Sequence, residues 1–120
     1  VSLPTLDDAA LAVELTGSRS ALSSLLGQAK TYLAYPYGHV DDRVESATRA
    51  AGYAAAFSVE SGFNRRDVNP FRIRRIDVFG TDTPNMLLRK MQLGSNDGSL
   101  AAAVRYYSRR LSGRVVARAS

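Results

Sequence analysis

Apolar and polar residues follow two different spacings along this chain, and their alternation predicts strands separated by helices. The apolar run Tyr32–Tyr37 ends in a Pro-Tyr-Gly turn and predicts a buried strand, and Tyr53–Val59 predicts a second strand. Between them, about ten residues with helical spacing begin after Asp41 and end at Gly52. Two strands joined through such a helix predict a right-handed parallel crossover.

A longer helix is expected before the first strand. One helical face carries residues at steps of four and three, namely Leu11, Leu15, Ser18, Leu22 and Leu25. Asp7 or Asp8 provides the N-cap, and Gly27 provides a left-handed stop.

The second half of the chain predicts one more strand and two more helices. Residues 60–69 are polar and predict a loop over one end of the sheet, and 71–79 alternates as a third strand. A Thr-Pro pair opens a helix over 83–94, and a loop over 95–99 leads to a final amphipathic helix. The apolar stripe of that last helix is Leu100, Val104, Tyr107, Leu111 and Val115.

These elements predict an α/β fold with parallel strands, with three strands and about four helices in one domain over residues 1–120. Parallel strands need cover on both faces, and three strands are few for such a sheet. No segment predicts a signal peptide or a membrane span, and the absence of cysteine excludes disulfides and thiolate metal sites.

Charge is distributed unevenly along the chain. Residues 1–60 carry four basic and seven acidic side chains, whereas residues 61–120 carry twelve basic and four acidic ones. This asymmetry permits an anionic partner for the second half, but we prefer to interpret it as a solvated arginine surface.

Four segments together resemble a known family. They are the motif Tyr32-Leu33-Ala34-Tyr35-Pro36-Tyr37-Gly38, then Gly38–Val44, Ala50–Val59 and Pro70–Val78. In that order and with those spacings they resemble the C-terminal half of the polysaccharide deacetylases (NodB-homology carbohydrate esterases), in the branch with a Phe-Ala-Tyr-Pro-Tyr-Gly-type third motif. The resemblance covers residues 1–94 and leaves 95–120 as a C-terminal helix. It implies part of a distorted (β/α) barrel, to which this chain contributes the later strands.

The resemblance also implies a chemistry. Such an enzyme hydrolyses an N-acetyl, or less often O-acetyl, group of a glycan. With the N-acetyl group it cleaves a C–N bond other than a peptide bond. The family uses a divalent metal such as zinc, two histidines of a His-[Ser/Thr]-x-x-His motif, and an early Asp-Asp pair that supplies the base and a metal ligand. Val1–Leu6 resembles the sequence that follows the second histidine, so we expect the base and both histidines to be absent from this chain.

The residues of this chain give the same expectation. His39 is the only histidine, and we expect it to be a solvated loop residue rather than a ligand. Asp7-Asp8 and Asp41-Asp42 superficially resemble the Asp-Asp pair, but both precede helical patterns and are interpreted as caps. We therefore predict that this chain alone binds no metal and is inactive.

The resemblance assigns the Pro-Tyr-Gly turn to substrate binding. The backbone N–H of Tyr37 corresponds to a donor to the oxyanion of the tetrahedral intermediate, with Pro36 and Gly38 shaping the turn. Tyr35 is expected to line the substrate site.

A bracing arginine is expected near the catalytic aspartate. Many relatives carry it two positions before the proline, where this chain has Ala34. The family's Leu-Pro-Arg-Ile segment corresponds to Ile73–Ile76, with Arg74 replacing proline, so Arg75 is the candidate brace. An Arg75–Asp77 pair on one strand face is the alternative.

The partners expected from the resemblance are an acetylated glycan and either the missing N-terminal half or a self-association partner. It also suggests the bacterial cell envelope or secretion. The alternative is a non-catalytic binding or assembly module that uses Arg110, Arg114 and Arg118 of the basic last helix for polyanions. No nucleic-acid motif accompanies these arginines, so nucleic acid is not expected, and the apolar stripe equally suits a helix that closes the barrel.

Overall fold

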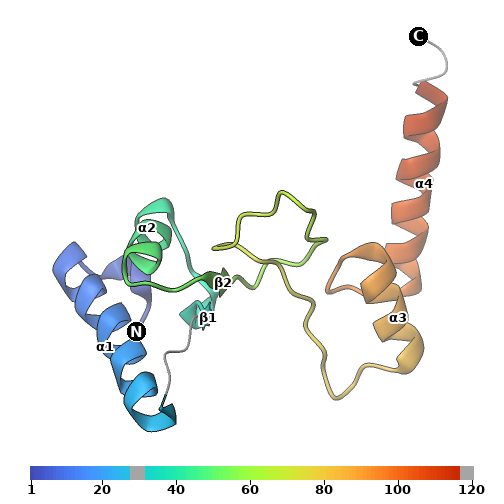
Figure 1. Cartoon of the computed structure of the whole chain (residues 1–120). Helices are drawn as coiled ribbons and strands as arrows, with labels where there is room; N and C mark the ends of the chain where they lie inside the picture. Colours follow the sequence, from blue (N-terminus) through green and yellow to red (C-terminus); the bar gives the residue numbers. More distant parts are fainter. Residues whose placement is uncertain (28–31, 117–120) are drawn as a thin grey trace. The chain divides into compact units, whose positions relative to one another are not determined.

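The chain forms two compact units, Val1–Arg75 (unit 1) and Ile76–Ser120 (unit 2). The computed structural model describes residues 1–27 and 32–116. Unit 1 holds the two strands and the first two α-helices, and unit 2 holds α3 and α4 (Figure 1). The four expected helices are therefore all present, and the assignment of 1–120 to a single domain stays a prediction.

Helix α1 (Asp8–Leu26) follows a short 3-10 helix, η1 (Leu3–Thr5). The Asp7 side chain caps α1 by accepting a hydrogen bond from the N–H of Ala10 at 2.7 Å, and Gly27 ends the helix in the left-handed conformation, with φ 70°. Both predicted end signals are confirmed.

The predicted apolar face of α1 is buried only in its first half. Leu11 and Leu15 are 1% and 2% exposed, whereas Leu22 and Leu25 are 40% and 80% exposed. The first two turns therefore anchor α1 to the core of unit 1.

The two strands pair in parallel, as the sequence predicts. Strand β1 (Tyr32–Ala34) lies beside β2 (Ala55–Phe57), with Leu33 opposite Ala56. Both strands are shorter than predicted. Helix α2 (Asp42–Ala50) forms the connection, and its cap is Asp41, whose side chain accepts from the N–H of Val44 at 2.7 Å.

Residues 71–79 do not form the predicted third strand. Ile73 makes a single parallel bridge to Phe57. Its N–H donates to the carbonyl of Ala56 at 3.0 Å, and its carbonyl accepts from the N–H of Ser58 at 2.9 Å. The described residues thus hold two of the three expected strands.

Asn69 explains why the ladder does not extend. Its side-chain oxygen accepts from the N–H of Phe71, and its carbonyl accepts from the N–H of Arg72, both at 2.9 Å. These bonds form a turn immediately before the bridge. After the bridge, the N–H of Arg75 donates to the carbonyl of Glu60, which belongs to the loop rather than to a strand.

The core of unit 1 lies between the helices and the two strands. Val44 and Ala56 are fully buried, and Phe71 is 3% exposed although it lies outside any strand. The cluster consists of Leu3, Leu11, Leu15, Tyr35, Val44, Tyr53, Ala56 and Phe71.

Unit 2 is a helix pair with one buried ion pair. Helix α3 (Pro84–Leu93) begins at a Thr83 cap, as predicted, and ends at the left-handed Gly94. Lys90 is 2% exposed, and its Nζ donates to Asp82 Oδ2 at 2.6 Å and lies 4.8 Å from the centre of the Phe79 ring. The ammonium of Lys90, together with the N–H of Phe79, lowers the pKa of the Asp82 carboxyl.

Helix α4 (Leu100–Val116) exposes its predicted apolar stripe. Leu100, Val104, Tyr107 and Leu111 are between 52% and 69% exposed, and the side chains of Arg114 and Val115, like residue Arg118, lie outside the described part. The role of this stripe in closing a barrel stays a prediction. None of the described helices combines the length and the apolar character that crossing a bilayer requires.

Candidate oxyanion site

The candidate site is the turn that follows β1, which backbone hydrogen bonds hold in place. The N–H of Tyr35 donates to the carbonyl of Phe57 at the end of β2. The next residues form a 3-10 turn, η2 (Pro36–Gly38), in which the N–H of Gly38 donates to the carbonyl of Tyr35 at 2.9 Å. The turn is thus fixed at the carboxyl ends of both parallel strands, which is where sites form in sheets of this kind.

Tyr37 has an unusual backbone conformation. With φ 56° and ψ 6°, it is the one non-glycine residue with positive φ among the described residues. This conformation costs an L-residue about 1–2 kcal/mol, so the surrounding structure must hold it in place. The side chain is 74% exposed, and within the described residues the N–H of Tyr37 makes no hydrogen bond. A backbone donor is therefore available at an exposed turn.

The buried side chain of Tyr35 anchors this turn in the core. Its side chain is 2% exposed, and its hydroxyl donates to the carbonyl of Phe71 at 3.0 Å. Burial raises the pKa of the Tyr35 hydroxyl, partly offset by a hydrogen bond with Thr48. The family resemblance predicts that Tyr35 lines a substrate site, whereas the structure places its side chain in the core.

Gly38 lets the turn pack closely on Val59, two residues after the end of β2. Its φ of 71° lies in the left-handed region, and a Cβ at this position would fall within 3 Å of three side-chain atoms of Val59. The glycine therefore allows the turn to lie against Val59, which precedes the 60–74 segment.

The 60–74 segment forms a pocket of about 450 Å³. The Asn64 side chain braces it by donating to the carbonyl of Arg74 at 2.8 Å and accepting from the N–H of Arg74 at 2.9 Å. The pocket combines one half-exposed aromatic ring, Phe63, with charged and amide groups. Its lining is Glu60, Phe63, Arg65, Asp67, Val68, Asn69, Arg72 and Arg74.

Arg72 ties this pocket to α2. Its Nε donates to Glu45 Oε2 at 2.7 Å and its Nη2 donates to Asp42 Oδ1 at 2.5 Å. The pKa of the Glu45 carboxyl is lowered, first by the hydrogen bond from Asn69 and then by Arg72, and the same pair raises the pKa of Arg72. Sequence reasoning missed Arg72, because neither acidic partner is near it in the sequence.

Arg75, the candidate brace, is exposed. No carboxylate of the described residues in unit 1 pairs with its guanidinium. Its alternative partner, Asp77, belongs to unit 2, where its carboxylate accepts a hydrogen bond from Asn96 at 2.9 Å. Both roles for Arg75 stay predictions.

The described residues do not fit a metal site. Nowhere in residues 1–27 and 32–116 do three His, Cys, Asp or Glu side chains gather in a way that could hold an ion. His39 is exposed, and its Nδ1 lies 3.2 Å from the hydroxyl of Ser2. Asp7 and Asp41 serve as helix caps, as predicted.

The parallel β1–α2–β2 unit and its turn define a (β/α) protein with a candidate oxyanion donor. The family model described as polysaccharide deacetylase matches residues 1–56. Residues 1–56, which include the motif around Tyr37, thus match the polysaccharide deacetylase family, as that motif predicts. No curated protein sequence matches the chain.

Two solved structures resemble the chain. The deacetylase PplD of Streptococcus pyogenes, determined in complex with acetate, matches 76% of this chain with a TM-score of 0.70 and 21% identity. A polysaccharide deacetylase from Bacillus cereus matches 69% of this chain with a TM-score of 0.62 and 28% identity. The chain spans 40% and 26% of these two proteins, respectively.

Proposed function

We propose that this chain is the oxyanion-binding and substrate-positioning part of a deacetylase domain that removes N-acetyl, or less often O-acetyl, groups from a glycan. The exposed, positive-φ Tyr37 with its unbonded N–H is the observation that carries this proposal. The match of residues 1–56 to the polysaccharide deacetylase family model supports the reaction class. The arrangement of the chain as the later part of a distorted (β/α) barrel belongs to the same proposal.

The reaction assigns a specific task to the Tyr37 amide. Water adds to the acetyl carbonyl, the carbonyl oxygen becomes negative, and the C–N bond then breaks to give acetate and a protonated amine. A fixed N–H aimed at that oxygen is worth more in the transition state than in the ground state, by about 3 kcal/mol in measured cases. Pro36 and Gly38 keep the amide in place, and Tyr35 anchors the turn through Phe71.

The pocket formed by the 60–74 segment is suited to a sugar. An aromatic ring next to amide and charged groups can stack on the apolar face of a sugar and bond its hydroxyls. Phe63, Asp67 and Asn69 are the residues that we assign to this contact. Arg75 stays the proposed brace of the catalytic aspartate.

The remaining catalytic groups must come from elsewhere. The divalent metal that the family implies finds no site among the described residues, so no step is assigned to it. We propose that the base and the metal ligands are provided by further polypeptide, either an N-terminal portion or an associated chain.

Removal of the Tyr37 amide alone tests the proposal. The substitution is made in the natural polypeptide. Replacing Tyr37 by the corresponding α-hydroxy acid converts the amide into an ester and deletes the N–H without changing the side chain. We expect the kcat for acetate release from an N-acetylchitooligosaccharide to fall about 10²–10³-fold.

Val40 provides the matched control. Its N–H also makes no hydrogen bond within the described residues, and it lies outside the turn. The same ester at Val40 should leave kcat close to that of the unmodified protein. Full activity with the Tyr37 ester would refute the oxyanion role, and a natural polypeptide that releases no acetate would refute the deacetylase proposal.

A binding or assembly module without catalysis is the second candidate. It is favoured by α4, in which no acidic side chain accompanies the arginines. Two results together would select this function. The natural polypeptide would release no acetate, and its retention on heparin resin would fall steeply with salt.

A further inference from the structure

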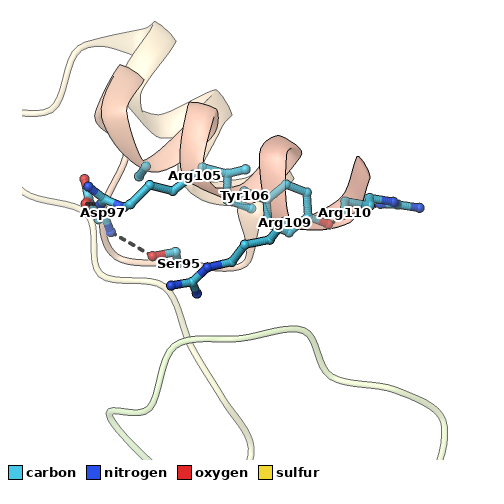
Figure 2. Close-up of a pocket in the computed structure, with 8 residues that line it drawn as sticks. Ser95, Asp97, Arg105, Tyr106, Arg109 and Arg110 are labelled. Carbon is cyan, nitrogen blue, oxygen red and sulfur yellow. Dashed lines mark hydrogen bonds and ion pairs between the residues drawn. The ribbon is translucent and has the colours of Figure 1, made fainter. Parts of the chain in front are cut away.

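We propose that unit 2 carries a separate pocket that binds an oxyanion group, phosphate or carboxylate, carried by a glycan. The pocket has a volume of about 550 Å³ and lies between α4 and the 95–99 loop (Figure 2). Its lining is Leu93, Ser95, Asp97, Ala102, Arg105, Tyr106, Arg109 and Arg110. That the oxyanion is carried by a glycan rests on the proposed deacetylase function.

The positive charge of the pocket is not balanced by its own helix. From residue 98 to residue 120 the sequence contains five arginines and no acidic residue. Arg105 and Arg109 lie four positions apart on α4, a spacing at which like charges destabilise a helix. An oxyanion between them would turn this repulsion into attraction.

Asp97 is the one carboxylate in the lining. Its Oδ2 accepts from Arg105 Nη2 at 3.1 Å, and its Oδ1 accepts from the N–H of Ser99 at 3.0 Å. Hydrogen bonds from Ser99, followed by the charge of Arg105, lower the pKa of the Asp97 carboxyl. Arg105 therefore already contacts a carboxylate, and three arginines against one aspartate leave the lining positive.

The shape of the pocket suits a sugar that carries the anion. Leu93, 8% exposed, and Ala102 provide an apolar surface, while Ser95 and Tyr106 provide hydroxyls. In Figure 2 the Arg105 side chain extends toward Asp97, and Arg109 extends toward the segment that holds Ser95. Arginine forks bind phosphate and carboxylate in two-pronged fashion, and volumes of this order hold small ligands.

Arg110 contacts the side chain of Tyr106. Its Nη1 lies 3.3 Å from the hydroxyl of Tyr106, one turn earlier on α4. Tyr106 in turn meets the Tyr107 ring edge-on, with centroids 5.3 Å apart. These contacts hold an arginine and a hydroxyl in place at one wall of the pocket.

A titration of the 120-residue chain followed by amide NMR tests the proposal without any deacetylation step. The probes are N-acetylglucosamine 6-phosphate, glucuronic acid and, as a neutral control, N-acetylglucosamine. We expect at least one charged sugar to shift the amides of residues 93–110 saturably at concentrations up to about 10 mM. Which of the two binds identifies phosphate or carboxylate as the preferred group.

Three variants assign the binding to the pocket. Arg110→Gln should weaken binding about tenfold, whereas Arg66→Gln, which removes the same charge from an exposed residue of unit 1, should leave it unchanged. Asp97→Asn should tighten binding severalfold, because it removes the carboxylate that competes with the ligand for Arg105. A gain of affinity cannot result from a variant that simply unfolds.

Four results would overturn the proposal. The first two are chemical shift changes of equal size with the neutral sugar, and no saturable change at residues 93–110 with either charged sugar. The third is an equal loss of sugar affinity in Arg110→Gln and Arg66→Gln. The fourth is a thymidine oligonucleotide that binds at the same residues more tightly than the charged sugars. The last result would assign the pocket to nucleic acid. Each can occur whether or not the natural polypeptide is a deacetylase, so failure here is distinguishable from failure of the proposed function.

Discussion

Substitution of Gly38 by alanine tests how tightly the candidate oxyanion turn is held. The added Cβ would lie 2.8 Å from Val59 Cβ and at most 2.5 Å from each of the two Val59 methyl carbons. Rotation of the valine side chain moves the methyl groups but leaves Val59 Cβ where it is, so relief requires a backbone shift.

Two costs add in Gly38→Ala. The left-handed φ of 71° costs alanine about 1–2 kcal/mol, and the forced contact with Val59 costs about 1–3 kcal/mol. We expect the free energy of unfolding to fall by about 2–5 kcal/mol, which is a large share of the stability of a small domain.

A double-mutant cycle with Val59→Ala separates the two costs. The alanine at position 59 removes both methyl contacts and leaves only the Cβ contact at 2.8 Å. Urea unfolding followed by circular dichroism should show a favourable coupling of about 1 kcal/mol or more between the two substitutions. A Gly38→Ala variant within about 0.5 kcal/mol of the parent protein, or strict additivity with Val59→Ala, would refute this account of the turn.

Two further predictions concern the framework of unit 1. Leu11→Ala should lower the free energy of unfolding by about 2–5 kcal/mol because Leu11 is 1% exposed. Val13→Ala, at a position that is 71% exposed, should change it by less than about 0.5 kcal/mol. Urea titration of both variants checks this contrast. Glu45→Gln should cost about 1 kcal/mol at pH 7, since its partner Arg72 is 35% exposed and solvent screens the pair. Because folding lowers the pKa of Glu45 from 4.5, its contribution is present above pH 4.5 and is lost as the pH falls through the folded-state pKa. Unfolding curves of the two proteins should therefore converge in acid, and a difference that stays constant with pH would contradict the assignment.

Local signals in the sequence account for most of the elements. Asp7, Asp41 and Thr83 are caps in the structure, and Gly27 and Gly94 end their helices as predicted. Each of these signals acts through hydrogen bonds or dihedral preferences within a few residues of the helix end, so a sequence pattern is enough to find it.

The third strand was not predictable in the same way. Residues 71–79 alternate as a strand should, but the side chain of Asn69 bonds the N–H of Phe71 and turns the chain before a ladder can form. That bond depends on the conformation of the Asn69 side chain, which hydrophobic alternation does not report.

The turn that forms the candidate site was predicted from the sequence, but the environment of its side chains was not. The Pro-Tyr-Gly motif correctly located a tight turn, but nothing in it distinguishes the buried Tyr35 from the exposed Tyr37, or indicates that Tyr37 rather than glycine alone adopts positive φ. Arg72 depends on contacts with α2 that are 27 and 30 residues away in sequence. Such long-range partners become evident only in the folded chain.

We propose that this chain provides an oxyanion donor but neither the metal ligands nor the base of a deacetylase. Acetate release from an N-acetylchitooligosaccharide by the isolated 120-residue chain, with and without added Zn²⁺, tests it most directly. We expect no release above the protein-free control in either condition. Release that requires the metal and saturates with substrate would contradict it.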